Sequence, residues 1–301
     1  MSASTRPRTP PITLRAGPLS LGLVPDIGGS VAFFRVGSAD LMRALSVSDD
    51  ARGDVLGTAM FPMVPYANRI AGNRFTFGDA EWQVSPNNPP ERFNVHGTGW
   101  RRPWQVDRSG FAEAWLSLEH DDPPDPYTYR AVQRFVLTPE GLIVTMTITN
   151  RGVRPMPFGF GLHPWFERDD ARLMFRATRF WLEGPEGVAT EPITLPVELD
   201  FGVSRRLPAT WRNNAYGGWD GKAEIRFPAR GLGLRIDAGP LFTHLMFYAD
   251  PDKPYFCLEP QTNAPCAFNR VGHVDAATLG IITLDPGQTS EGSVSFKPLL
   301  L

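Results

Sequence analysis

The chain has 301 residues, of which 42% are hydrophobic and 21% charged, and its formal net charge is −2. This near balance of charge argues against nucleic acid or an anionic membrane as a partner, and no run of about 18 apolar residues predicts a membrane span. Two cysteines, Cys257 and Cys266, are too few for a disulfide framework or a four-cysteine zinc site, and the polar N-terminus precedes no apolar signal segment, so we expect reduced thiols in a cytoplasmic protein.

Taken in order, the chain begins with a polar segment, residues 1–11, that we expect to be flexible, and continues as one domain over residues 12–301. Its 30 prolines and 29 glycines recur at short intervals, as turns do between short strands. A short helical piece is predicted near residues 54–59. The predicted strands are residues 12–14, 30–36, 74–77, 114–118, 129–137, 142–149, 224–227, 233–237, 245–248, 256–259, 281–284 and 289–297.

Residues 142–149 show the strand pattern well. Four apolar side chains from Leu142 to Ile148 fall on one face, and threonines dominate the other. Long amphipathic helices and internal repeats are missing. Many short strands with regular turns predict an all-β, antiparallel sandwich or barrel.

Four segments carry side chains that suit the binding of a polar ligand or acid–base chemistry. Asn68 and Arg69 follow two prolines, and an arginine can donate a fork of hydrogen bonds to hydroxyls or a carboxylate. His96 precedes a Gly-rich stretch, where the backbone can approach a ligand closely. The structural alternatives are a surface turn with a solvated arginine for the first segment and a hairpin turn with an incidental histidine for the second.

His163 stands among aromatic residues and before a proline, which favours an extended conformation and a shaped pocket. Glu259 ends an apolar strand, where burial would raise its pKa towards that of a general base. A core histidine and an exposed strand-end glutamate are the structural alternatives.

The other histidines are weaker candidates: His120 lies in an acidic stretch typical of a solvated loop, His244 precedes an apolar strand, and His273 lies in a Gly-rich loop. No His-x-x-x-His or Cys-x-x-Cys spacing predicts a transition-metal site. No glycine-rich phosphate loop or Gly-x-Ser-x-Gly elbow is present, so nucleotide chemistry and serine hydrolysis are not indicated.

Five segments in order resemble the aldose 1-epimerase (galactose mutarotase) family. They are Pro65-Tyr-Ala-Asn-Arg-Ile70, Asn94-Val-His-Gly97, Gly161-Leu-His-Pro-Trp-Phe166, Leu258-Glu-Pro-Gln-Thr-Asn-Ala-Pro265 and Leu284-Asp-Pro-Gly-Gln288. The resemblance runs from about residue 20 to the C-terminus. It implies a large antiparallel β-sandwich of the galactose mutarotase-like type and interconversion of the α and β anomers of a free aldose, without metal or cofactor.

The resemblance also implies roles for particular residues. His163 would be the general acid at the ring oxygen and Glu259 the general base at the C1 hydroxyl, while Asn68, Arg69 and His96 would bind the substrate. As an acid, His163 must be protonated at rest, so its pKa should not be depressed by burial. The residues that could form an apolar platform for the sugar are Trp100, Trp165 and Trp219.

The chain departs from the family at Asn213, which stands where the family has an Asp that binds sugar hydroxyls. We expect Asn213 to bind the substrate in its place. Asn can donate and accept, but it loses the charge-assisted bond.

Two other functions stay open: a binding module that holds a sugar without converting it, and an epimerase for a sugar phosphate or acid, with Arg101, Arg102 and Arg212 as candidate anion ligands. A glycosidase is disfavoured because it needs two carboxylates around the scissile bond. The expected partner is a small sugar, and the expected assembly a monomer or homodimer.

Overall fold

A computed structural model describes residues 9–301 of the chain. The predicted flexible segment, residues 1–11, therefore lies mostly outside the described residues. Residues 9–11 are described, and the hydroxyl of Thr9 donates to Asp26 Oδ1 at 2.9 Å.

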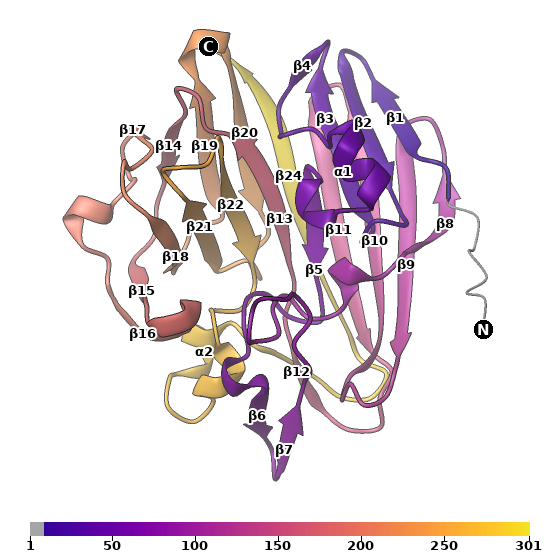
Figure 1. Cartoon of the computed structure of the whole chain (residues 1–301), viewed down its shortest axis with the longest axis vertical. Coiled ribbons are helices and arrows are strands. Elements are labelled where there is room, and N and C mark those ends of the chain that lie inside the picture. Colours follow the sequence, from indigo (N-terminus) through magenta and orange to yellow (C-terminus); the bar gives the residue numbers. More distant parts are fainter. Residues whose placement is uncertain (1–8) are drawn as a thin grey trace.

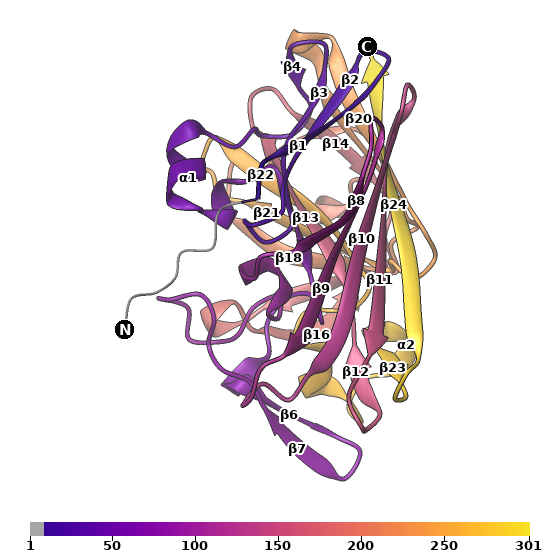
Figure 2. The same ribbon diagram turned by 90° about the vertical axis from the view of Figure 1, so that its right-hand side faces the viewer.

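Over these described residues, two large sheets of antiparallel strand pairs lie face to face, as Figure 1 and Figure 2 show. The first has 11 strands in the order β1-β2-β3-β5-β13-β22-β21-β18-β15-β16, with β4 beside β3. The second has nine in the order β17-β14-β19-β20-β24-β11-β10-β9-β8. This confirms the expected large antiparallel sandwich.

The strands of the first sheet are β1 Ile12–Ala16, β2 Leu19–Val24, β3 Ser30–Val36, β4 Ala39–Asp40, β5 Met60–Met63, β13 Gly161–Glu167, β15 Arg179–Glu183, β16 Ala189–Thr194, β18 Arg212–Gly217, β21 His244–Ala249 and β22 Tyr255–Gln261. Those of the second are β8 Gln105–Ser109, β9 Glu113–Asp121, β10 Thr128–Thr138, β11 Gly141–Asn150, β14 Arg172–Phe175, β17 Arg205–Arg206, β19 Lys222–Phe227, β20 Leu232–Ala238 and β24 Thr289–Leu300. Two small ribbons pair β6 Arg74–Phe77 with β7 Ala80–Gln83 and β12 Met156–Phe158 with β23 Ile282–Leu284.

Helices are short: α1 Val47–Arg52, α2 Ala276–Leu279 and 3-10 turns at Val55–Gly57, Ala71–Asn73, Gly99–Arg101, Pro185–Gly187, Val197–Leu199, Pro228–Arg230 and Ala267–Arg270. In the described part of the chain, none is long and apolar enough to span a membrane.

The predicted helical piece near residues 54–59 is only partly right. The α-helix comes earlier, because Ser46 caps its first turn and Gly53 ends it in a left-handed conformation. Residues 54–59 hold a single 3-10 turn, which Asp54 caps.

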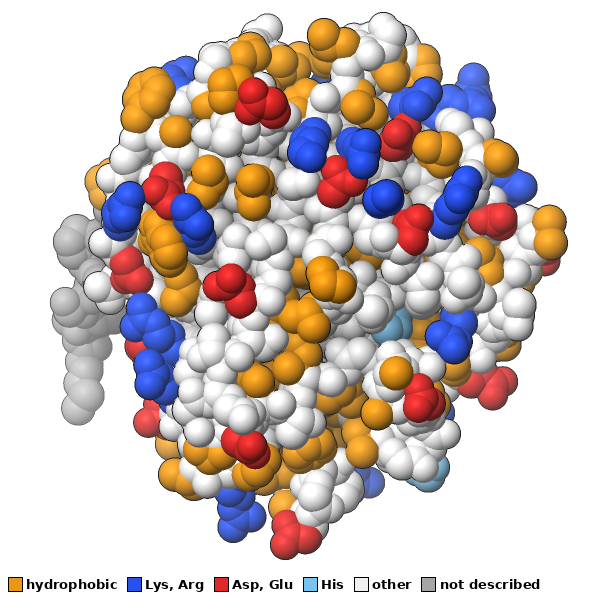
Figure 3. Space-filling view, turned by 180° about the vertical axis from the view of Figure 1, so that it is seen from behind, with side chains coloured by type: hydrophobic (Ala, Val, Ile, Leu, Met, Phe, Trp, Pro, Cys, Tyr) orange, Lys and Arg blue, Asp and Glu red, His pale blue; other side chains and the backbone are white. Residues whose placement is uncertain are grey.

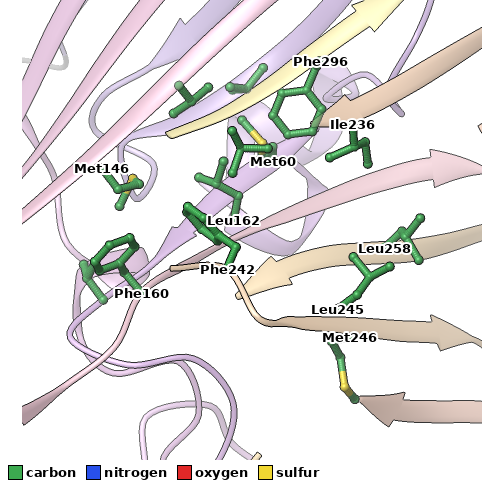
Figure 4. Packing of buried hydrophobic residues seen from close by; sticks show 14 of the residues in the cluster. Met60, Met146, Phe160, Leu162, Ile236, Phe242, Leu245, Met246, Leu258 and Phe296 are labelled. Carbon is green, nitrogen blue, oxygen red and sulfur yellow. The ribbon is translucent and has the colours of Figure 1, made fainter. Parts of the chain in front are cut away.

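The core lies between the sheets. Leu162, Leu245 and Leu258 of the first sheet share a buried cluster with Ile236 and Phe296 of the second (Figure 4). Side chains alternate along a strand, so the residues next to Leu162, Leu245 and Leu258 in the sequence point to the outer face of the first sheet.

The outer face of the second sheet is charged but mixed in sign, with Lys and Arg interspersed among Asp and Glu (Figure 3). Arg226 pairs with Glu224 there, and Asp237 pairs with Arg235 and Lys297. The site described below lies instead on the outer face of the first sheet.

Candidate active site

His163 and Glu259 face each other across two neighbouring strands. The antiparallel register of β13 and β22 pairs Gly161 with Gln261 and Trp165 with Cys257, which puts His163 opposite Glu259. Their side chains meet, with His163 Nε2 3.2 Å from Glu259 Oε1, and both are buried. Two titratable residues some 100 positions apart in the sequence thus form one buried pair.

Loops above the sheet bring Asn68 and His96 to this pair. Both adopt positive φ, 63° and 60°, which is uncommon for residues other than glycine. They hold each other: His96 N–H donates to Asn68 O at 2.9 Å, and Asn68 N–H donates to His96 Nδ1 at 3.0 Å. In the neutral ring, His96 Nε2 then carries the proton and is a donor.

Arg69 is held along one edge by Glu91. Its Nε and Nη2 donate to the two carboxylate oxygens at 3.1 and 3.0 Å, and its side chain is only 15% exposed. Gly187 packs against the guanidinium so closely that a Cβ there would lie 3.0 Å from Cζ. The arginine is therefore fixed in position at the side of the site.

These residues line one pocket of about 690 Å³. Of the residues proposed from the sequence, it contains Asn68, Arg69, His96, Trp100, His163, Trp165, Asn213 and Glu259. Trp219 does not belong to it: its side chain is buried in the core between the sheets, and its Nε1 donates to Lys222 O at 2.9 Å. A tryptophan in a Gly-rich segment gave no indication of which face of the sheet it would take.

The pocket also contains residues that the sequence analysis missed. Glu91 holds Arg69, while Glu183 and Trp211 lie near Asn213, where Asn213 Nδ2 donates to Glu183 Oε1 at 2.6 Å. Glu183 ends β15, a strand that the sequence analysis did not predict, so the strand-end criterion that selected Glu259 could not be applied to it. Tyr248 lines the pocket beside Trp211, with ring centroids 5.4 Å apart.

Aromatic rings enclose His163. Phe61 and Trp165 stack on it with centroid distances of 4.3 and 4.8 Å, and Trp100 stacks behind Phe61 at 5.2 Å. Trp100 donates from Nε1 to the backbone and is buried, so it supports the wall from behind.

Burial acts on the proton affinities of the pair in opposite directions. It lowers the pKa of His163 to about 3 and raises the pKa of Glu259 well above its usual range, an effect that Arg69 opposes. The expectation that burial would not depress the pKa of His163 was wrong, because apolar rings cover it on both sides. Both shifts favour the neutral forms of the two side chains, an imidazole and a carboxylic acid, over an ion pair.

Burial also lowers the pKa of His96 well below its ordinary value, with His163 and Arg69 adding to the effect. His96 is therefore a neutral hydrogen-bond donor at neutral pH.

Donor atoms of His96, His163 and Glu259 lie within 4.8 Å of one another, a spacing that could hold a metal ion. A metal-binding histidine normally donates its second ring N–H to an acceptor. Here Nδ1 of His96 accepts a bond from Asn68 N–H instead, so its Nε2 has no free lone pair. This arrangement suits a hydrogen-bonding site rather than a metal centre.

The remaining histidines lie elsewhere. His120 was assigned to a solvated loop, but it is buried in β9 with Nε2 3.2 Å from Asp125 Oδ2. The acidic neighbours at 121 and 122 misled the interpretation, since β9 extends to Asp121. His244 is buried on β21, and its Nδ1 lies 3.2 Å from Thr262 O.

Arg101, Arg102 and Arg212 do not line the pocket. Arg101 stacks on Trp100 with Cζ 4.2 Å from a ring centroid, Arg102 pairs with Asp122, and Arg212 bonds to the backbone. Both cysteines are buried and free.

The fold and site define an antiparallel β-sandwich with a buried histidine–glutamate pair in a pocket of about 690 Å³ on one sheet. Residues 11–297 match the aldose 1-epimerase family. The chain is 35% identical to the uncharacterised protein YphB of Escherichia coli (strain K12), over 95% of this chain and 97% of that protein. The chain therefore belongs to the aldose 1-epimerase family.

Solved structures agree. A putative aldose 1-epimerase from Escherichia coli K12 superposes with a TM-score of 0.89 at 34% identity, covering 97% of this chain and 99% of that one. A GalM/aldose epimerase homologue from Caenorhabditis elegans gives 0.82 at 17% identity, covering 97% and 99%, and thus shares the fold.

Proposed function

We propose that the protein is an aldose 1-epimerase that interconverts the α and β anomers of a free aldose by opening and closing its ring. The observation that carries this proposal is the buried pair of His163 Nε2 and Glu259 Oε1, 3.2 Å apart, at the base of the pocket.

The spacing suits the chemistry. The hydroxyl oxygen O1 and the ring oxygen O5 are both bonded to C1, so two adjacent protein atoms can reach both. Glu259 removes the proton of the C1 hydroxyl while His163 delivers one to O5, and the C1–O5 bond breaks to give the open-chain aldehyde. After C1 turns about its bond to C2, the same protons return and the ring closes on the other face.

One proton in the pair is enough for this cycle. Ring opening takes the pair from charged, with a carboxylate and an imidazolium, to neutral, with a carboxylic acid and an imidazole. Burial disfavours the charged form and so assists the opening step. The sugar hydroxyls, Arg69 and His96 stabilise the charged form before it.

Glu259→Gln and His163→Asn should each slow anomer interconversion at least about 10²-fold, because each removes one positioned proton-transfer group. Polarimetry or NMR of freshly dissolved α-glucose, α-galactose and other aldoses measures this, after subtraction of the spontaneous rate. Glu119→Gln and His273→Asn, whose positions do not line the pocket, are the matched controls. An unchanged rate in either site variant would refute the role of that residue.

A binding module that holds sugar without converting it would use the same pocket. Sugar affinity without accelerated mutarotation in the wild-type protein would support that function instead. An epimerase for a sugar phosphate or acid is less supported, because the three arginines proposed for it lie outside the pocket.

A further inference from the structure

Glu183 differs from the other carboxylates of the pocket in its partners. Glu91 pairs with Arg69, Glu186 with Arg92, and Glu259 with His163. In the described part of the chain, no Lys or Arg pairs with Glu183.

Instead, two neutral donors hold the Glu183 carboxylate. Asn213 Nδ2 donates to Oε1 at 2.6 Å, and Trp211 Nε1 donates to Oε2 at 3.0 Å. A carboxylate oxygen accepts about two hydrogen bonds, so each oxygen keeps the capacity for another donor. Glu183 is thus fixed in place with its charge uncompensated and part of its accepting capacity free.

The register of the sheet aims Glu183 at the same face as the acid–base pair. β15 pairs with β18 at Phe180 and Tyr216, and the hydrogen bond from Asn213 Nδ2 to Oε1 places Glu183 beside Asn213. β18 in turn pairs Asn213 with Tyr248, and Tyr248 lies opposite Cys257, two residues from Glu259 on β22. Side chains two residues apart share a face, so Glu183, Asn213 and Tyr248 line the wall beside the pair.

Trp211 adds an apolar surface at this wall. Its ring is 46% exposed and packs edge-on against Tyr248 while its N–H is held by Glu183. An exposed aromatic face beside a fixed acceptor suits a sugar ring, which has an apolar C–H face and hydroxyl donors at its edge.

We infer that Glu183, held by Asn213 and Trp211, binds the hydroxyls of the sugar and makes the site selective for neutral aldoses over anionic ones. This inference rests on the proposed function and specifies its substrate class. A hydroxyl gives Glu183 a charge-assisted hydrogen bond, whereas a uronate or phosphate group at this wall meets an uncompensated negative charge. The two arginines of the pocket offer little relief, because both are already paired with glutamates.

The first test is Glu183→Gln, assayed with galactose and glucose and with galacturonate and glucuronate. For the neutral sugars, we expect KM to rise about tenfold or more with kcat within about twofold, because one charge-assisted bond to the bound sugar is lost. For the uronates, KM should rise less than for the neutral sugars, or fall. The ratio of kcat/KM for neutral sugars to kcat/KM for uronates should therefore decrease. Glu119→Gln, the same change on the second sheet, is the matched control.

The second test exchanges the two facing side chains. Asn213→Asp alone puts two carboxylates side by side and should weaken sugar binding through their repulsion. The double variant, Glu183→Gln with Asn213→Asp, restores one carboxylate and one amide in exchanged positions. The double variant should recover most of the affinity lost in the single variants. If the single variants were weak because they fold poorly, the double variant would not recover. Thermal unfolding of each variant shows whether it is folded.

An unchanged KM in Glu183→Gln, or a double variant no better than the single ones, would overturn this role. If the wild-type protein accelerates mutarotation of no aldose, the proposed function fails separately. NMR titration of the same four sugars into wild type and Glu183→Gln then decides the question: weaker binding of neutral sugars to the variant supports the role, and equal binding overturns it.

Discussion

At the residue scale, the proposed cycle makes the protonation of His163 and Glu259 determine how activity depends on pH. The cycle needs one proton in the pair. On the acid side, a second proton binds His163, whose pKa burial lowers to about 3, and the base is lost. On the alkaline side, Glu259 gives up its proton above a pKa that burial raises well beyond the usual value, and the acid is lost.

We therefore expect a bell-shaped profile of kcat/KM whose acid limb lies well below pH 6.5, the ordinary pKa of histidine. The measurement is the enzyme-dependent mutarotation rate from acid to alkaline pH, each point corrected for the spontaneous reaction. Loss of activity as the pH falls through about 6.5 would show instead that a histidine with an ordinary pKa governs the reaction.

Glu91 positions Arg69 and is not itself expected to touch the sugar. Glu91→Gln weakens a pair whose arginine is only 15% exposed, so Arg69 gains freedom and KM should rise about 2–10-fold with a smaller change in kcat. Glu91→Asp keeps the negative charge, so its KM should lie between that of the wild type and that of Glu91→Gln.

The matched control is Glu186→Gln at the same rim. It breaks an ion pair whose arginine is 72% exposed and should change KM little. Equal effects of Glu186→Gln and Glu91→Gln would contradict a positioning role for Glu91.

At the element scale, the loop that carries His96 depends on Gly97. Its φ is +65°, and a Cβ there would lie 2.3 Å from Pro65 Cδ and 2.6 Å from Val64 O. Gly97→Ala should therefore destabilise the fold by about 3 kcal/mol or more and displace His96, with loss of mutarotation.

Gly78 isolates the backbone part of this effect. It has φ +64° but nothing within 4 Å of its Cβ position, so Gly78→Ala should cost only about 1–2 kcal/mol and leave the site intact. Chemical denaturation of both variants measures the difference. Equal losses of stability would show that the contact with Pro65 and Val64 contributes nothing.

The same scale explains what could be predicted from the sequence. Strands such as β11 follow from alternation, because the pattern is local and the outer face is polar. The position of helix α1 was missed although Ser46 and Gly53 mark its ends, since a helix of six residues is too short to show a periodic pattern. The partnership of Glu183 with Asn213 depends on strand register, which no local pattern reveals.

At the scale of the whole molecule, the family resemblance supplied what local patterns could not. It joined His96, His163 and Glu259 before the register of β13 and β22 was known, and these residues do line one pocket. The suggestion that Trp219 forms part of an apolar platform was wrong, because a sequence segment does not determine which face of a sheet a side chain takes.

We propose that residues 12–301 unfold as one cooperative unit. Strand β24, near the C-terminus, lies in the middle of the second sheet between β20 and β11, while the first strands of the chain form one side of the other sheet. The largest buried cluster includes Leu162 of the first sheet and Leu234 of the second, so the two sheets share this core, while a smaller cluster with Phe61 and Trp165 lies on the outer face of the first sheet. Leu162→Ala and Leu234→Ala should each lower the free energy of unfolding by about 2–5 kcal/mol and shift the same single transition.

Far-UV circular dichroism, tryptophan fluorescence and mutarotase activity followed during denaturation should then change together in wild type and in both variants. Ile143→Ala on the outer face of β11, where the side chain is 39% exposed, is the control and should shift the midpoint little. Two separate transitions, or a variant that shifts one probe and not the others, would divide the sandwich into independent units. Leu162 packs into the core from the same strand that carries His163. A common shift would therefore mean that the geometry of the His163–Glu259 pair depends on the packing of the first sheet against the second.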